Sequence, residues 1–188
     1  MLEEFFSPKP RLGISACLLS EKGRYDGGDK KDYFLAETFG RQVEWVSVCP
    51  EVEIGMGIPR EAVRLVGDPA KPRMIAERSG KDWTSQFDSF IAKRVQPLTG
   101  LDLASYIFKK NSPSYGVKRV RVYSAKGVPT SKAVDSSAGA LMRELPLLPV
   151  GEEGRLNDPT LRENFSSHAF LPIIAGNDLR AAVGRSRL

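Results

Sequence analysis

Histidine, cysteine and long apolar runs are all scarce in this chain of 188 residues, and each scarcity excludes a class of protein. With a single histidine, His168, the chain cannot build a histidine-rich zinc site and has only one candidate base for a serine or cysteine nucleophile. Its two cysteines, Cys17 and Cys49, are too few for a disulfide framework and too far apart in sequence for a CxxC motif. The apolar runs stop well short of the ~20 residues of a membrane span, and the acidic first residues do not match a signal peptide. The sequence therefore predicts a cytoplasmic protein without a membrane anchor.

The composition is that of one folded core with a mildly basic surface. Hydrophobic residues make up 41% of the chain and charged residues 27%, which suits a single compact domain. The net charge is +5, but acids and bases alternate along the chain and form no basic block. This excess fits an ordinary solvated surface and leaves anionic ligands or nucleic acid open as partners.

Predicted strands alternate with predicted helices along most of the chain. Short apolar or β-branched runs predict strands over residues 12–16, 43–48, 103–108, 120–123 and 147–150. Helical spacing predicts helices over residues 31–41, from Asp82 or Thr84 to about Pro97, and over residues 137–145. Residues 50–80 show no sustained period and are expected to be one long irregular stretch. Since parallel strands need crossover connections, this order predicts an α/β, three-layer, Rossmann-like fold with a mostly parallel sheet and helices on both faces.

The last part of the chain differs from the rest. After Phe165 the sequence has no clean helical or strand period, and it ends with Arg180, Arg185 and Arg187. We therefore expect one α/β domain over residues 1–165 and a C-terminal tail of uncertain packing over residues 166–188.

Three predicted strands are followed directly by residues that can take part in chemistry. Cys17 follows the first strand, Cys49 follows the second, and the turn NSPSYG, residues 111–116, follows the third. Ligands of open α/β sheets bind outside the carboxyl ends of the strands, so these three ends are expected to face one crevice. Two thiolates there would suit a soft metal or an iron–sulfur cluster, and they are the only two evident soft ligands for it. The alternative of two ordinary buried thiols is favoured by spacing alone.

Five segments in matching order over residues 11–165 carry a family resemblance. They read SACLLS, RYDGG, CPEVEIGMGIPRE, FKKNSPSYG and PLLPVGEEGRLNDPTLRENF. Together they resemble the thiouracil desulfidase family, long catalogued as a domain of unknown function. The resemblance implies that three cysteines hold a four-iron, four-sulfur (4Fe-4S) cluster whose open fourth iron takes sulfur from a thiolated pyrimidine. Cys17 and Cys49 match the first two of these ligands.

The third ligand position departs from the family pattern. Where the family has SPSCG, this chain has SPSYG, which puts Tyr115 in place of cysteine. Ionising tyrosine at pH 7 costs roughly 2 kcal/mol more than ionising cysteine, and a phenolate oxygen suits an iron–sulfur cluster less well than a thiolate. A ring that fills the vacated pocket and contacts substrate fits Tyr115 better than ligation does.

Five further residues near these strand ends are candidates for the reaction. Glu51 can move a proton beside a nucleobase, and Ser112 can donate a hydrogen bond to a reacting thiocarbonyl, so we expect both to be catalytic. Ser114, Asp26 and Arg60 are candidate substrate-binding residues. The alternatives stay open: a surface glutamate, serines that cap a turn, and a structural ion pair between Asp26 and Arg60.

The resemblance implies a non-redox desulfidase that removes sulfur from a thiolated nucleobase of the thiouracil type, impaired here by the loss of the third cysteine. One alternative is a cluster-free paralogue that binds a small heterocycle or nucleotide without catalysis. A second is an RNA-binding module that uses the basic tail, although the chain has no recognised RNA motif. The expected partner is a small thiolated nucleobase, and we expect neither nucleic acid nor a membrane.

Overall fold

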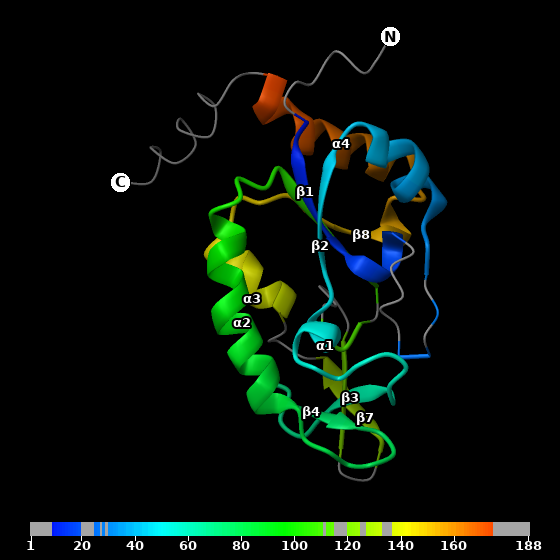
Figure 1. The fold of residues 1–188 in the computed structure, drawn as a ribbon, viewed down its shortest axis with the longest axis vertical. Helices are drawn as coiled ribbons and strands as arrows, with labels where there is room; N and C mark the ends of the chain where they lie inside the picture. The colour runs from blue at the N-terminus through cyan, green and yellow to red at the C-terminus, as the bar shows by residue number, and fades with distance from the viewer. Residues whose placement is uncertain are drawn as a thin grey trace.

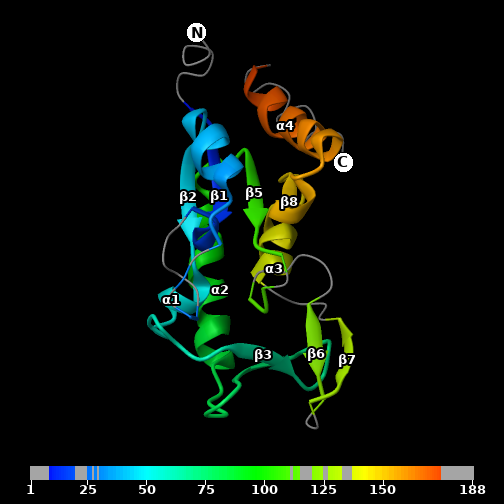
Figure 2. The ribbon, with the colours of Figure 1, turned by 90° about the vertical axis from the view of Figure 1, so that its right-hand side faces the viewer.

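A computed structural model of the chain describes residues 9–19, 25, 26, 28, 30–110, 112–114, 120–124, 127–132 and 137–174. Four parallel strands form the sheet that carries both cysteines, and we call it sheet A. Its strands are β1 (Arg11–Ser15), β2 (Glu44–Val48), β5 (Ser105–Phe108) and β8 (Val150–Glu152). They lie in the order β2-β1-β5-β8, and each neighbouring pair is parallel (Figure 2). The predicted α/β fold with a mostly parallel sheet is confirmed.

Side chains of β5 point alternately to two hydrophobic clusters, one on each face of sheet A. Tyr106 and Phe108, both fully buried, join a cluster with residues of α2 (Thr84–Thr99) and α3 (Ser137–Glu144). Ile107 joins a cluster with Leu35, Leu156 and other residues on the opposite face. This alternation follows from the period of two along a strand, and it creates the three predicted layers.

Gly13 in β1 allows the close packing of Tyr106 on the neighbouring strand. A Cβ atom at position 13 would lie 2.1 Å from a ring carbon of Tyr106, which no rotamer adjustment of a buried ring relieves easily. The ring of Tyr106 also stacks on that of Phe108 at a centroid distance of 4.3 Å. The glycine therefore lets a large aromatic residue lie across the middle of the sheet.

A second sheet, sheet B, was not expected. It contains β3 (Val63–Val66), β4 (Arg73–Ala76), β6 (Arg121–Tyr123) and β7 (Pro129–Lys132), in the order β4-β3-β6-β7. The prediction that residues 50–80 are irregular is wrong, because they contain β3, β4 and the short helix α1 (Pro50–Glu53). The predicted fourth strand of the parallel sheet is also misplaced, since it forms β6 of sheet B. Strands of three or four residues are too short for a period of two to stand out, and they gain stability here by burying Leu65, Met74 and Val122.

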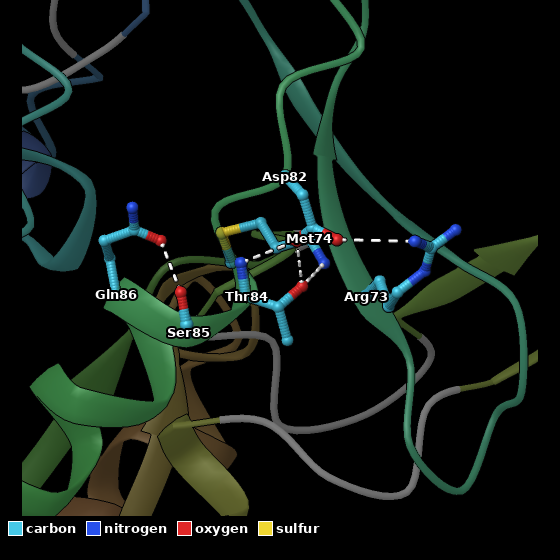
Figure 3. Close-up of polar contacts among 6 residues, drawn as sticks. All are labelled: Arg73, Met74, Asp82, Thr84, Ser85 and Gln86. Atoms are coloured by element: carbon cyan, nitrogen blue, oxygen red, sulfur yellow. Dashed lines mark hydrogen bonds and ion pairs between the residues drawn. The ribbon is translucent and has the colours of Figure 1, made fainter.

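Helix α2 runs beside sheet A and reaches sheet B (Figure 1). Its start is fixed by the hydrogen bonds drawn in Figure 3. Asp82 Oδ1 accepts the backbone N–H of Thr84 at 2.9 Å and its hydroxyl at 2.5 Å, and Thr84 Oγ1 accepts the N–H of Met74 in β4 at 3.0 Å. The N-cap itself is Trp83, which makes no side-chain cap hydrogen bond, so Asp82 and Thr84 hold the start of the helix from the residues on either side of it. The helix continues to Thr99, two residues beyond Pro97.

Replacement of Asp82 by alanine is expected to lower the free energy of unfolding by about 1 kcal/mol at pH 7, the usual net contribution of a hydrogen bond. The hydrogen bonds from Thr84 and the nearby Arg73 hold the pKa of the Asp82 carboxyl below its usual value. Its stabilising effect is therefore complete above that usual value and is lost as the pH falls through the lower folded-state pKa. Urea unfolding of both forms at pH 7 and at pH 2.5 to 3 checks this. Equal stabilities at pH 7 would contradict this stabilising role of Asp82 at the start of α2.

The remaining elements agree with the sequence in part. Residues 31–41 form a π-helical turn, η2 (Phe34–Thr38), and a 3₁₀ turn, η3 (Phe39–Arg41), where one regular helix is expected. Helix α3 is confirmed, whereas the predicted strand over residues 147–150 begins only at Val150. Among the described residues, no helix is both long and apolar enough to span a membrane.

Helix α4 (Pro159–Ile174) crosses the position where the tail is expected to begin. The sequence left the packing of the chain after Phe165 uncertain, and residues 166–174 continue α4. The helix has a strong start signal in Asp158, whose Oδ1 accepts the N–H of Leu161 at 3.0 Å, and it continues although SSHAFLPII lacks apolar periodicity. The tail arginines, Arg180, Arg185 and Arg187, lie outside the described residues.

Candidate functional site

A cavity of about 310 Å³ opens at the carboxyl ends of β1, β2 and β5, and we call it the cysteine cavity. Both cysteines line it, together with Glu51, Arg60 and Ser112. Its other described lining residues are Ser15, Ala16, Tyr25, Lys30, Val48, Pro50, Lys109, Lys110 and Pro113. The prediction that Cys17 and Cys49 converge at one sheet edge is confirmed. Tyr115, the third member of that prediction, lies outside the described residues.

The two cysteines reach the cavity from adjacent parallel strands. Cys17 lies in the 3₁₀ turn η1 (Ala16–Leu19) directly after β1, and its carbonyl accepts the N–H of Lys30 at 3.0 Å. Cys49 follows β2 and precedes Pro50, the first residue of α1. Proline suits this first position because it has no N–H to lose and its φ already matches a helix. The turn of α1 then places Glu51 beside Cys49.

Glu51 is the centre of the polar contacts in the cysteine cavity. Its Oε1 accepts the hydroxyl of Ser114 at 2.5 Å, and Ser114 Oγ lies 2.9 Å from Ser112 Oγ. Its Oε2 accepts the thiol of Cys49 at 3.6 Å and lies 3.9 Å from an Arg60 guanidinium nitrogen. Ser114 is fully buried, and the side chains of Arg60 and Glu51 are only 7% and 12% exposed. Glu51 is thus a held carboxylate facing the cavity rather than a surface glutamate.

Arg60 and Asp26 differ in burial: the Arg60 side chain is 7% exposed, whereas Asp26 is an exposed residue. Arg60 lines the cavity, where its guanidinium pairs with Glu51 and donates to the Gly57 carbonyl at 3.3 Å, and its backbone N–H donates to the Tyr25 carbonyl at 2.7 Å. Asp26 is exposed, and its Oδ1 accepts the N–H of Gly28 at 3.1 Å, as in an Asx turn. The geometry therefore brings Arg60 to the candidate site, and an ion pair between Asp26 and Arg60 stays a prediction.

Burial raises the pKa of the Cys49 thiol to about 12, with the Glu51 carboxylate as the second cause. At neutral pH the thiol keeps its proton, in agreement with its hydrogen bond to Glu51. A metal ligand must be deprotonated, so any soft metal bound here would have to displace this proton.

The sequence analysis did not identify the residues that hold the backbone directly after β5. The N–H of Lys109 donates to Ser15 Oγ at 3.0 Å, and the N–H of Lys110 donates to Glu153 Oε2 at 2.6 Å. The Lys109 ammonium also pairs with Glu153. The segments FKKNSPSYG and GEEGR contain these residues, but their pairing across β5 and β8 is visible only once the strands are adjacent.

The donor set of the cysteine cavity does not complete the cluster site that the resemblance implies. The cavity contains two thiols, and the sequence contains no third cysteine. Among the residues that the structure describes, no three His, Cys, Asp or Glu side chains gather closely enough to hold a metal ion. A 4Fe-4S cluster with one open iron needs three protein ligands, so the described residues supply one too few.

Comparison with known proteins agrees with this architecture. A solved structure of the 4Fe-4S-dependent thiouracil desulfidase TudS matches 84% of this chain and 99% of its own, with 27% sequence identity and a TM-score of 0.61. No curated protein matches the chain significantly. The family model described as 2-thiouracil desulfurase matches residues 12–153, which include both cysteines, Glu51 and both serines. The chain therefore belongs to the 2-thiouracil desulfurase family.

Proposed function

We propose that this chain keeps a desulfidase-type pocket for a small thiolated nucleobase but, with Tyr115 at the third ligand position, holds a 4Fe-4S cluster poorly. It would then remove sulfur from 2-thiouracil slowly or not at all. The observation that carries the proposal is the cysteine cavity, which is lined by two thiols, the Glu51 carboxylate and the Ser112 hydroxyl. The buried Ser114 hydroxyl contacts Ser112 and donates to Glu51 behind this lining. Membership of the family and the likeness to TudS support the substrate class.

The polar residues of the cavity suit a flat heterocycle with alternating N–H and carbonyl or thiocarbonyl groups. Glu51 accepts from Ser114 and Cys49 and retains lone pairs that can accept a ring N–H. The Ser112 hydroxyl lines the cavity and can donate to a ring carbonyl or thiocarbonyl, while its partner Ser114 is turned toward Glu51. An Arg60 guanidinium nitrogen lies 3.9 Å from the Glu51 carboxylate and carries the opposite charge.

In the reaction itself, 2-thiouracil and water would give uracil and hydrogen sulfide: a water oxygen bonds to the ring carbon, and the carbon–sulfur bond breaks. Glu51 is proposed to exchange a proton with a ring nitrogen during this replacement. Its contact with Ser114 fixes the position of the accepting oxygen, so little reorientation is needed. Ser112 is proposed to orient the exocyclic group. Asp26 does not line the cavity, so the scheme places Arg60, and not Asp26, beside the carboxylate.

Binding of 2-thiouracil to the cluster-free protein tests the pocket apart from the cluster. We expect saturable binding by isothermal titration calorimetry, weakened about tenfold or more by Glu51→Gln, because a charge-assisted hydrogen bond contributes about 1.5 to 3 kcal/mol. The matched control is Glu53→Gln on the same helix, since Glu53 pairs with Arg94 at 3.3 Å and does not line the cavity. The proposed pocket would be contradicted if 2-thiouracil did not bind the wild type, or if Glu51→Gln and Glu53→Gln lost the same affinity for it.

A further inference from the structure

A second cavity, of about 270 Å³, lies between α2, α3 and sheet B, and we call it the α2–α3 cavity. Figures 1 and 2 show the two helices beside each other with sheet B at one end of α2. Nothing in the proposed desulfidase chemistry uses this space. Its volume is close to that of the cysteine cavity and lies just below the lower end of the usual range for ligand pockets, which suits a small ligand.

The interior of the α2–α3 cavity is apolar. Leu65 and Met74 line it from sheet B, Phe87 and Ile91 line it from α2, and Ala140 lines it from α3. The polar groups at its sheet B end are already paired. The hydrogen bonds of Figure 3 join the N–H of Met74 to Thr84 Oγ1 and the Thr84 hydroxyl to Asp82. A ligand body in this space therefore meets mainly carbon and sulfur atoms.

The charges that border the α2–α3 cavity lie on its exposed side and are positive on balance. Lys71 and Arg143 carry positive charges and Asp88 a negative one, and all three residues are exposed. A ligand that buries an apolar ring and keeps one negative group at this mouth would match both the interior and the balance of charge.

Pro113 forms a wall common to both cavities. It lines the α2–α3 cavity and also the cysteine cavity. The serines on either side of it, Ser112 and Ser114, make the 2.9 Å contact that leads to Glu51. The proline ring fixes φ at position 113, so we expect a displacement of this ring to move the flanking residues of the turn.

We propose that the α2–α3 cavity binds a small apolar monoanion of the aromatic carboxylate class and that its occupancy changes the position of the Ser112–Ser114 turn through Pro113. The cavity thus serves as a second site whose ligand adjusts the cysteine cavity. Its binding stands apart from the proposed desulfidase function, because neither the thiols nor a cluster takes part.

Binding is tested by titration calorimetry with 2-naphthoate as the anionic probe and 2-naphthalenemethanol as its neutral counterpart. We expect saturable naphthoate binding that weakens at least tenfold in Ala92→Trp, since Ala92 is an exposed lining residue whose enlargement fills the mouth. The matched control, Gln96→Trp, is exposed on the same helix outside the cavity and should bind within twofold of the wild type. We also expect weaker binding of the neutral probe and a severalfold loss in Lys71→Gln. No saturable binding, or equal binding to Ala92→Trp, would overturn the site, and equal affinity for both probes would overturn the choice of an anion.

The link to the cysteine cavity is tested by amide NMR of the cluster-free protein. Addition of 2-naphthoate should shift the amide signals of Ser112, Ser114 and Glu51 in the wild type and leave them unchanged in Ala92→Trp. Unchanged signals at saturating naphthoate would overturn the link. A failure of 2-thiouracil to bind in the separate titration would count against the proposed function alone, because this readout needs no 2-thiouracil.

Discussion

Replacement of Tyr115 by cysteine is expected to raise turnover of 2-thiouracil at least about thirtyfold after anaerobic reconstitution with iron and sulfide. Tyrosine ionises with a penalty of roughly 2 kcal/mol relative to cysteine at neutral pH, which corresponds to that factor in occupancy. Thiolate sulfur also suits iron–sulfur clusters better than phenolate oxygen, so thirtyfold is a lower bound on the gain in turnover. The measurement is formation of uracil and release of sulfide by equal amounts of the two proteins.

The control for this comparison is Tyr33→Cys, which also gives the chain a third cysteine. Tyr33 is 72% exposed and does not line the cysteine cavity. We expect its turnover to equal that of the wild type, because an added thiol acts only at the ligand position. Equal rates for wild type and Tyr115→Cys would show that another group already completes the site. The proposal that the wild type holds a cluster poorly would then be wrong.

Replacement of Glu51 by glutamine in the Tyr115→Cys protein is expected to lower turnover by 10² to 10⁴, the usual range for loss of a positioned acid or base. The amide keeps the size of the side chain and its ability to accept from Ser114, but it cannot exchange the proton. Iron content should stay within about twofold of the parent, since glutamine replaces no thiol. Steady-state rates of uracil formation and iron content are measured on the same samples.

Glu53→Gln in the same background is the matched comparison for this second prediction. Glu53 shares the helix α1 with Glu51 but pairs with Arg94 on α2, so its loss should change turnover less than threefold. A rate for Glu51→Gln close to that of Glu53→Gln would contradict the proton-transfer role. If Glu51→Gln also lost iron relative to its parent, Glu51 would instead be a ligand of the cluster.

The part of the site that lies directly after predicted strands could be predicted from the sequence. The runs before Cys17 and Cys49 are apolar or β-branched and long enough to be recognised as strands, and the parallel order of an α/β fold then places their ends together. Glu51 was accessible for the same reason, as it lies two residues beyond Cys49. The pairing of Glu51 with Ser114 was not, because it joins residues 63 positions apart through a turn whose direction no local pattern fixes.

Sheet B escaped prediction for a different physical reason. Its four strands contain three or four residues each, and Gly67, with a φ of 102°, and the prolines between β3 and β4 resemble an irregular loop in sequence. Their stability comes from contacts with α2 and α3 through residues such as Met74, which only the folded chain brings together. Helix α4 shows the converse case, in which a strong start at Asp158 carries a helix into a segment without apolar periodicity.

The central claim is that the cysteine cavity is a desulfidase site short of one thiolate. Its most direct test is the iron and acid-labile sulfide content of wild type, Tyr115→Cys and Tyr33→Cys after identical anaerobic reconstitution and desalting. The account predicts about four irons and four sulfides per chain in Tyr115→Cys, as a 4Fe-4S cluster requires. It predicts only a small fraction of that content in the other two proteins. A full complement of iron and sulfide in the wild type would contradict it.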